Sequence, residues 1–471
     1  MYGKITSCLV AAALAAVTAA PSLTASAQTT DASQGDSAKS QNISVPERPN
    51  IIVFVTDDQR KVTSVMPNVR HYFKEEGRRF PHAFVTTPVC CPSRASIMTG
   101  QYAHNHGVLS NRPGVVLDNF VERDTIQKHL QSIGYRTGIV GKFLNGYDSG
   151  KDPRYFDSYA IPIDDDYYDP VYNIDGQSTQ VQGYTTDFMR EWIHGFLDNP
   201  DPRPWYLYVS VRAPHNPYQP SPQYADAPVP EWKPSPAVFE RNKSDKPFYV
   251  REASHTYEQA EFIRTQQLRT LMSVDDLVAD LFSRLESRGE SGDTLAFFVS
   301  DNGYMWGEHG LIAKDVPYTP SVKVPFFMRW PGHVEPGSSD SRLVGNIDIA
   351  PTIFEALGVP GPDVDGRNLL DSSWDRSRII LEHWCNVNGC NRWTSLRTHT
   401  RQYVEYYDSE GNTTFREFYN LSEDPDQLRN VLHDGIPGNA PNVERWSEEL
   451  RWAKACGGAV VGLPLAPFSA L

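Results

Sequence analysis

The sequence predicts an α/β protein built on a large, mainly parallel β-sheet flanked by helices. Four short apolar runs end in polar residues, as strands buried on both faces of a parallel sheet do. These runs are 51–55, 135–140, 205–211 and 295–299. Between the last two, apolar residues from Leu271 to Leu285 recur at helical spacing, which indicates a crossover helix.

Length and composition exclude several classes of protein. The chain has 471 residues, of which 22% are charged and 11% aromatic, a balance typical of folded proteins and not of disordered ones. Its formal net charge is -14, which argues against a general nucleic-acid binder. We therefore expect a large folded protein without a nucleic-acid partner.

The N-terminus has the pattern of an export signal. Residues 1–27 combine Lys4, an apolar stretch and a terminal Ala-Ser-Ala, which predicts a cleaved signal peptide; the alternative is a membrane anchor or a core helix. Residues 28–48 are polar and read as a disordered leader. No other long apolar stretch follows, so we expect a secreted, extracytoplasmic protein without a membrane span.

The remaining chain divides into two predicted parts. We place the main domain at 49–370, and it includes a loop at 214–236 with eight prolines, too many for regular structure. Beyond it the alternation loosens into strand-like pieces such as 402–407 and 415–419. We expect a smaller α+β subdomain at 371–471.

Polar residues after two of the predicted strands form a candidate metal site. Asp57 and Asp58 end one run, and Asp301 and Asn302 end another. Ligands of open α/β sheets bind at the carboxyl ends of the strands, and oxygen donors suit a hard cation, calcium or alternatively magnesium. Taken alone, such pairs are more often turns or helix caps.

The segment from Thr87 to Gly100 is a candidate reactive site. Pro92 followed by Ser, Arg and Ala indicates a helix start, which places Cys90 near a helix N-terminus, where anions are favoured. Arg94 follows one turn later. The alternative for Cys90 is a structural disulfide or a buried thiol.

Cys90 to Gly100 resembles the C-x-P-S-R-x-x-x-M-T-G signature of the formylglycine-dependent sulfatases, a family with an alkaline-phosphatase-like fold. Other segments resemble further motifs of that family, in the expected order over about residues 48–435. They are Asp57-Asp58-Gln59, Gly141-Lys142, Ala213-Pro214-His215, Asp301-Asn302-Gly303, His309-Gly310-Leu311 with Lys314, Asp348 to Thr352, and Glu417 to Leu421 with Asp424-Pro425.

Details within these motifs resemble the N-acetylglucosamine-6-sulfatase and heparan endosulfatase branch. Two positions depart from common sulfatase patterns. Leu144 stands where many members carry a histidine, whose part would be absent or filled by another group such as Asn145 or a nearby histidine. Thr319 stands where a glutamate is common.

The resemblance implies a mechanism with named roles. A separate maturation enzyme would oxidise Cys90 to formylglycine, whose hydrate attacks sulfur and later expels sulfate. Arg94 and Lys142 would orient the hydrate, Lys314 would bind sulfate, and His215 would donate a proton to the ester oxygen. The implied ligands of the cation are Asp57, Asp58, Cys90, Asp301 and Asn302. The implied substrate contacts are Lys142, His215, His309 and Lys314.

Several alternatives stay open at this point. A lone histidine or lysine is usually structural or solvated, and we interpret His104 and His106 in that way. The branch points to 6-O-sulfated N-acetylglucosamine-type glycans such as glycosaminoglycans. The other readings are an arylsulfatase of broad specificity, a phosphoryl or phosphonate ester hydrolase, and a catalytically silent glycan-binding protein.

The six cysteines can be apportioned on this hypothesis. Cys8 leaves with the signal peptide, and Cys90 is converted. Cys385 and Cys390 form a plausible local disulfide in an oxidising compartment. Cys91 and Cys456 are either a pair or two free thiols.

Overall fold

A ten-stranded sheet forms the centre of the protein in the computed structural model, which describes residues 48–147, 151–164, 166–384 and 391–455. The strand order is β13-β2-β12-β9-β1-β8-β4-β5-β6-β7, and β9, β1, β8, β4 and β5 run parallel. The predicted mainly parallel sheet is therefore confirmed, with antiparallel strands at both sides. The predicted signal peptide and most of the leader lie outside the described residues.

The four predicted strands lie side by side in the middle of this sheet. The strands of the sheet are β1 (Asn50–Thr56), β2 (Arg78–Arg79), β4 (Arg136–Gly141), β5 (Ser158–Pro162), β6 (Val171–Ile174), β7 (Gln177–Gln180), β8 (Trp205–Ser210), β9 (Thr294–Ser300), β12 (Phe326–Arg329) and β13 (Ser338–Ser339). Strands β5 to β7 were not anticipated, because β5 and β6 have only 5 and 4 residues and β7 is polar and fully exposed.

Alternate side chains of β1 build two cores on opposite faces of the sheet. Ile51 and Val53 belong to one core, and Ile52 and Phe54 belong to the other, as the two-residue period of a strand requires. All four are fully buried. The continuous apolar run at 51–55 thus reflects burial on both faces.

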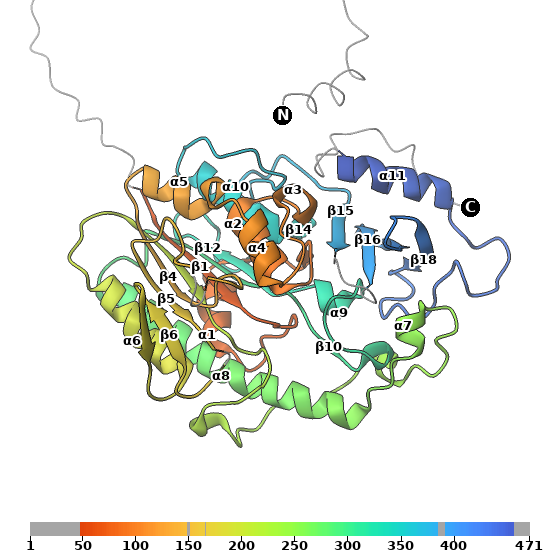
Figure 1. Ribbon diagram of the computed structural model, residues 1–471, viewed down its shortest axis with the longest axis horizontal. Coiled ribbons are helices and arrows are strands. Elements are labelled where there is room, and N and C mark those ends of the chain that lie inside the picture. The colour runs from red at the N-terminus through yellow and green to blue at the C-terminus, as the bar shows by residue number, and fades with distance from the viewer. Residues whose placement is uncertain (1–47, 148–150, 165, 385–390, 456–471) are drawn as a thin grey trace, which may run out of the picture. The chain divides into compact units, whose positions relative to one another are not determined.

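Helices cover both faces of the sheet (Figure 1). On one face lie α2 (Cys90–Thr99), α5 (Ile126–Ser132) and α10 (Ile349–Ala356), and on the other α6 (Thr185–Leu197) and α8 (Tyr257–Ser287). Helix α8 is the predicted crossover helix, and it begins with a capping box in which Thr256 and Gln259 satisfy each other's backbone N–H groups. Shorter helices include α1 (Pro67–Val69), α3 (Ala103–His106), α4 (Pro113–Asn119), α7 (Phe248–Arg251) and α9 (Thr319–Val322).

A four-stranded antiparallel sheet follows in the C-terminal part of the chain. It consists of β15 (Ile379–His383), β16 (Arg392–Arg397), β17 (Arg401–Tyr407) and β18 (Thr413–Asn420), with α11 (Val443–Ala455) beside it. Its core also contains Tyr102 and Ile347 from the larger part, and residues 48–455 accordingly lie in one compact unit. No helix among the described residues has the length and apolarity needed to cross a membrane.

A buried ion pair connects the start of α10 to the chain that leads into the small sheet. Both guanidinium Nη atoms of Arg376 donate to Asp348, at 2.8 and 2.7 Å, and the carboxylate also accepts the backbone N–H groups of Gly345 and Arg367. Asp348 is part of the D-I-x-P-T motif, so this motif residue has a structural role in the fold.

Removing Arg376 should therefore destabilise the protein strongly. Arg376→Leu leaves the Asp348 carboxylate buried without its cation, and we expect the free energy of unfolding in urea to fall by about 3–5 kcal/mol. The exposed pair of Arg190 and Asp187 is the control, and Arg190→Gln should change it by less than about 1 kcal/mol. Equal effects of the two substitutions would contradict the assignment.

Candidate functional site

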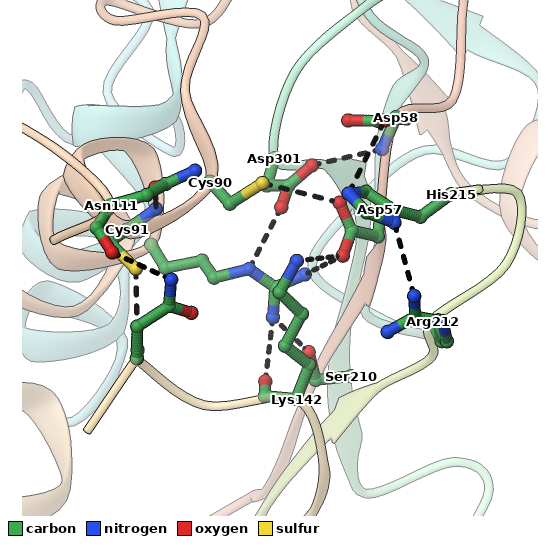
Figure 2. Close-up of polar contacts among 12 residues, drawn as sticks. Asp57, Asp58, Cys90, Cys91, Asn111, Lys142, Ser210, Arg212, His215 and Asp301 are labelled. Carbon is green, nitrogen blue, oxygen red and sulfur yellow. Dashed lines mark hydrogen bonds and ion pairs between the residues drawn. The ribbon is translucent and has the colours of Figure 1, made fainter. Parts of the chain in front are cut away.

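The predicted site residues meet at the carboxyl edge of the central strands. Asp57 and Asp58 follow β1, Asp301 follows β9, Lys142 follows β4, and His215 lies just beyond β8. These four strands are neighbours in the sheet, so their ends bring together residues up to 244 positions apart, such as Asp58 and Asn302. Figure 2 shows Asp57, Asp58, Lys142, His215 and Asp301 in the neighbourhood of Cys90.

Cys90 is the first residue of helix α2 and its thiol faces the carboxylates. Its Sγ lies 3.5 Å from Asp57 Oδ1 and 2.9 Å from Lys314 Nζ. The residue is buried, and burial together with the charge of Asp57 raises the pKa of the thiol to about 12. An unmodified Cys90 is therefore protonated at neutral pH and a poor nucleophile.

A group of side chains here could hold a metal ion. Ligand atoms of Asp57, Asp58, Cys90 and His215 all lie within 4.8 Å of one another. Asn302 donates to Asp58 Oδ1 at 2.6 Å, which leaves its own Oδ1 buried and without a hydrogen-bond partner in the described part of the chain. Carboxylate oxygens beside a free amide oxygen fit a hard divalent cation.

The backbone at Asp58 is constrained in a way that supports this geometry. Asp58 has a φ of 71°, a left-handed conformation that non-glycine residues adopt rarely. Its N–H donates to Asp301 Oδ1 at 3.1 Å. Such conformations cluster at functional sites, where the surrounding structure holds them in place.

Arg94 connects several of the strand ends. Its Nε donates to Asp301 Oδ2 at 2.8 Å, and its Nη1 donates to the carbonyl of Lys142 at 2.6 Å and to the hydroxyl of Ser210. Its Nη2 is 3.6 Å from Asp57 Oδ2, and none of the Arg94 side chain is exposed. Arg94 therefore positions the carboxylates.

Two lysines complete the charge balance. Lys142 Nζ is paired with Asp57, and Lys314 Nζ with Asp58. Burial alone would raise the pKa of Asp57, but the neighbouring cations, above all Lys142, hold it well below its usual range. Burial and the charge of Asp57 raise the pKa of Asp301 to about 6. Three carboxylates thus face three cations.

The orientation of His215 is set by its backbone neighbour. His215 Nδ1 lies 2.9 Å from the carbonyl oxygen of Asn216, which can only accept, so Nδ1 carries a proton. Nε2 then faces the site, 3.9 Å from Asp58 Oδ2. Arg212 donates to the same carbonyl at 2.7 Å and holds this turn in place.

The close approach of two strands explains Gly141 before Lys142. Gly141 has a φ of +94°, and a Cβ atom there would lie 2.0 Å from the carbonyl oxygen of Ser210. Only glycine fits this position. The Gly-Lys pair of the motif thus brings the Lys142 backbone within reach of Arg94.

Three predicted or considered histidines lie outside this cluster. His309 Nδ1 pairs with Glu240 at 2.6 Å, and its ring packs on Tyr318, so the structure does not bring it to Cys90 and its substrate contact stays a prediction. His104 pairs with Glu382 at 2.8 Å, and His106 hydrogen-bonds Ser96 at 3.1 Å. Both of the latter have structural partners.

The two departures from the sulfatase pattern have clear positions. Leu144 is buried in the core, and the side chain of Asn145 donates to the carbonyl of Asn111 at 2.7 Å. Neither Leu144 nor Asn145 thus supplies a cation near Lys142. Arg212 does, and it lines a cavity together with Lys142. Thr319 donates twice to Gln427 Oε1, at 2.8 Å each.

Sequence reasoning missed Ser210, Asn111 and Arg212 as parts of the site. Ser210 and Arg212 lie at the end of β8. Their place after a predicted strand was the one feature of the sequence that could have indicated a role in the site. The side chain of Asn111 accepts a hydrogen bond from the backbone N–H of Cys91 at 2.9 Å. No local sequence pattern predicts this contact. Cys90 and Cys91 are free thiols; Cys385, Cys390 and Cys456 lie outside the described residues, so the predicted pairings stay predictions.

Comparison with protein families agrees with this geometry. The family description "Sulfatase" matches residues 49–359, and "N-sulphoglucosamine sulphohydrolase, C-terminal" matches 307–450. The chain belongs to the sulfatase family. It is accordingly an enzyme, a sulfuric ester hydrolase, and the predicted family assignment is confirmed.

Individual relatives share most of this length. N-acetylglucosamine-6-sulfatase of Homo sapiens is 32% identical over 88% of this chain and 86% of its own. An extracellular sulfatase homologue of Drosophila melanogaster is 30% identical over 74% of this chain, which spans 33% of that protein.

Solved structures share the fold of this sulfatase. A protein in complex with its substrate D-glucosamine-2-N,6-O-disulfate has a TM-score of 0.75 and 24% identity, with 87% of this chain and 98% of that chain covered. The phosphonate monoester hydrolase of Agrobacterium radiobacter has a TM-score of 0.70 and 21% identity, covering 87% and 96%.

The pair of His104 and Glu382 should give the sulfatase a measurable pH dependence of stability. Burial opposes the charged imidazole, but the Glu382 carboxylate outweighs it and raises the pKa of His104. A raised folded-state pKa means that the stabilisation is complete below the unfolded value, about 6.5, and is lost as the pH rises through the folded value.

We therefore expect the difference in free energy of unfolding between the wild type and His104→Gln to shrink as the pH rises above about 6.5, the ordinary value for histidine. Urea unfolding at a series of pH values measures it. Using the difference between two proteins removes the titration of all other groups. A difference that is constant or grows with pH would contradict the pairing.

Proposed function

We propose that this sulfatase is a secreted enzyme that hydrolyses sulfate monoesters of sulfated glycans through a formylglycine formed from Cys90. The observation that carries the proposal is the position of the Cys90 side chain. It lies at the N-terminus of α2, in contact with Asp57 and Lys314. A nucleophile there lies beside two groups that attract an anion, the N-terminus of α2 and the Lys314 ammonium group.

Conversion of Cys90 would replace its unreactive thiol with an aldehyde that hydrates to a geminal diol. One hydroxyl oxygen attacks sulfur, and the bond from sulfur to the ester oxygen breaks. The second hydroxyl then loses its proton, the bond between carbon and the sulfate oxygen breaks, and the aldehyde and free sulfate result. A formylglycine-generating enzyme is the implied maturation partner.

The residues around Cys90 have distinct roles in this proposal. Lys142 and Lys314 would neutralise the oxygens of the bound sulfate. Three carboxylates lie nearby and would otherwise repel the sulfate. His215 points Nε2 into the site, and in its imidazolium form, with both ring nitrogens protonated, it would pass the Nε2 proton to the leaving ester oxygen. Arg94 keeps the carboxylates in place.

The implied divalent cation fits the donor set. Asp57, Asp58, Asp301 and Asn302 would hold it together with the oxygen that replaces Cys90 Sγ, and the all-oxygen set favours calcium, with magnesium as the alternative. The ion would supply Lewis acidity and two positive charges. The orphan Oδ1 of Asn302 would gain a partner.

Relatives and a cavity together suggest the substrate class. Besides Lys142 and Arg212, the cavity of about 240 Å³ is lined by Asn145 and Asp164. Cationic, amide and carboxylate groups in one cavity suit the sulfates and hydroxyls of a sugar. N-acetylglucosamine-6-sulfatase among the relatives supports a 6-O-sulfated glucosamine in a glycosaminoglycan.

Other activities of the same site remain as competing outcomes. They are arylsulfatase activity of broad specificity, phosphoryl or phosphonate ester hydrolysis, and glycan binding without turnover. The phosphonate hydrolase among the solved structures shares the fold alone. Secretion rests on the pattern of residues 1–27 and on an extracellular relative.

Cys90→Ala should abolish turnover while leaving the fold intact. We expect the kcat on 4-nitrophenyl sulfate to fall by at least about a thousandfold, with an unchanged urea midpoint. Cys91→Ala, at the adjacent buried thiol, is the matched control and should retain activity.

Intact-peptide mass spectrometry of active protein should find the aldehyde at Cys90, and unmodified cysteine in fully active protein would contradict the mechanism. Turnover of 4-nitrophenyl phosphate, measured beside turnover of 4-nitrophenyl sulfate, shows which ester the enzyme prefers. A preference for phosphate would contradict the proposed reaction.

Removal of divalent ions should lower both activity and thermal stability. Calcium at a hundred times its Kd would stabilise the folded state by about 2.7 kcal/mol, seen as a rise of a few degrees in Tm over the EDTA-treated protein. Asp58→Asn should abolish this response. Asp280→Asn, on α8 outside the site, should retain it, and a response retained by Asp58→Asn would contradict the site.

A further inference from the structure

A second group of cationic side chains lies at the edge of the sheet that carries the active site. Lys61 and Arg79 line a cavity of about 210 Å³ together with Phe80 and Phe326. Lys74 lines the cavity as well. Four more basic residues lie near it: His82 follows Pro81 of the lining, the ring of His399 packs edge-on against His82, and Lys323 and Arg397 both lie over the Phe84 ring. We call this group the basic pocket, and it comprises Lys61, Lys74, Arg79, His82, Lys323, Arg397 and His399.

The sheet register places the basic pocket on the same edge as Asp301. Strand β12 is antiparallel to β9, and its first residue Phe326 pairs with Val299, two positions before Asp301. Strand β2 is antiparallel to β12 and ends with Arg79 opposite Phe327. Strands β1, β9, β12 and β2 are successive neighbours, so the two sites are roughly 14 Å apart at about 4.8 Å per strand.

The positive charge of the basic pocket is not balanced by acidic side chains. No Asp or Glu lines the cavity. Within the described ranges, Lys61, Arg79, Lys323 and Arg397 form no ion pair with a carboxylate. The acidic group that acts on the pocket is Asp375, near His399.

Arg397 is the deepest member of the basic pocket. Its side chain is nearly buried, with its guanidinium 5.0 Å from the centre of the Phe84 ring. Nη1 donates to Thr319 and Gln402, and Nε has no hydrogen-bond partner among the described residues. Buried guanidinium groups are normally paired with an anion.

The basic groups of the pocket oppose one another's protonation. Desolvation and the charges of Lys323 and Arg79 lower the pKa of Lys61 to about 7. Desolvation, with Lys323, His399 and Lys61, lowers the pKa of His82 to about 4, so His82 is neutral at physiological pH. An anion bound among these groups would relieve this repulsion.

We propose that the basic pocket is a second binding site for anionic groups of a sulfated glycan chain whose scissile sulfate lies in the active site. The proposal deepens the proposed function and rests on it for the identity of the polymer. Lys61 follows Asp57 by four residues, so one segment connects the two sites.

The separation and the charges favour an extended polyanion over a small ligand. A single sulfated sugar in the active site does not reach roughly 14 Å along the sheet edge, whereas a glycan chain with repeated sulfates can. The net charge of -14 repels such a chain over most of the surface. Local clusters of unpaired cations must therefore supply the attraction.

Binding to heparin, a sulfated glucosamine polymer, tests the proposal. Binding is measured in a Cys90→Ala background so that no substrate is consumed. Lys61→Gln/Arg79→Gln removes one lysine and one arginine from the exposed rim of the pocket. Lys128→Gln/Arg451→Gln removes one lysine and one arginine from α5 and α11, outside the pocket.

We expect the pocket variant to bind heparin about tenfold more weakly at physiological salt, while the control variant changes its affinity by less than about twofold. In proteins with Cys90 intact, both variants should turn over 4-nitrophenyl sulfate like the wild type. The loss of affinity should appear as a higher KM for sulfated polymer.

Equal weakening by the two variants, or no weakening by the pocket variant, would overturn the proposal. So would displacement of heparin from the pocket by single-stranded DNA of equal charge, since that would mark a site for any polyanion. Absence of sulfate release by the wild type would refute the proposed function alone, because heparin affinity still reports on the pocket.

Discussion

The fully buried guanidinium of Arg94 is the interaction on which the rest of the site depends. It binds Asp301 after β9, the backbone carbonyl of Lys142 after β4 and the hydroxyl of Ser210 at the end of β8, and it lies beside Asp57 after β1. Arg94 itself is carried by α2, the helix that begins with Cys90. One cation therefore fixes four strand ends relative to Cys90. Replacing it would leave buried carboxylates uncompensated.

The balance of charge around Cys90 explains how an acidic protein can act on an anion. Asp57, Asp58 and Asp301 are matched by Arg94 and two lysines, so a bound divalent cation would make the site positive where a sulfate ester must enter. Because these groups are buried, their fields are weakly screened by salt. The basic pocket at the same sheet edge would extend this local attraction along a polymeric substrate.

Much of the fold could be predicted because its central strands are buried on both faces. The runs at 51–55 and 295–299 needed no partner to be recognised, and α8 followed from its helical spacing. Strands β5 to β7 at 158–180 could not be predicted, since β5 is placed by its pairing with β4 and β6 by its pairing with β5. The site followed the motifs, but Asn111, Ser210 and Arg212 entered it only through the folded backbone.

The sequence alone determined the chemistry of this protein: the order of the motifs, the cysteine before a helix, and the paired carboxylates at two strand ends. These are local features, which residue types and spacing encode directly. The tertiary structure decided which of the remaining polar residues act together. It directed His309 to Glu240, left Asn302 Oδ1 without a partner among the described residues, and brought Lys323 and Arg397 together over Phe84. Strand pairing brings together residues that are hundreds of positions apart.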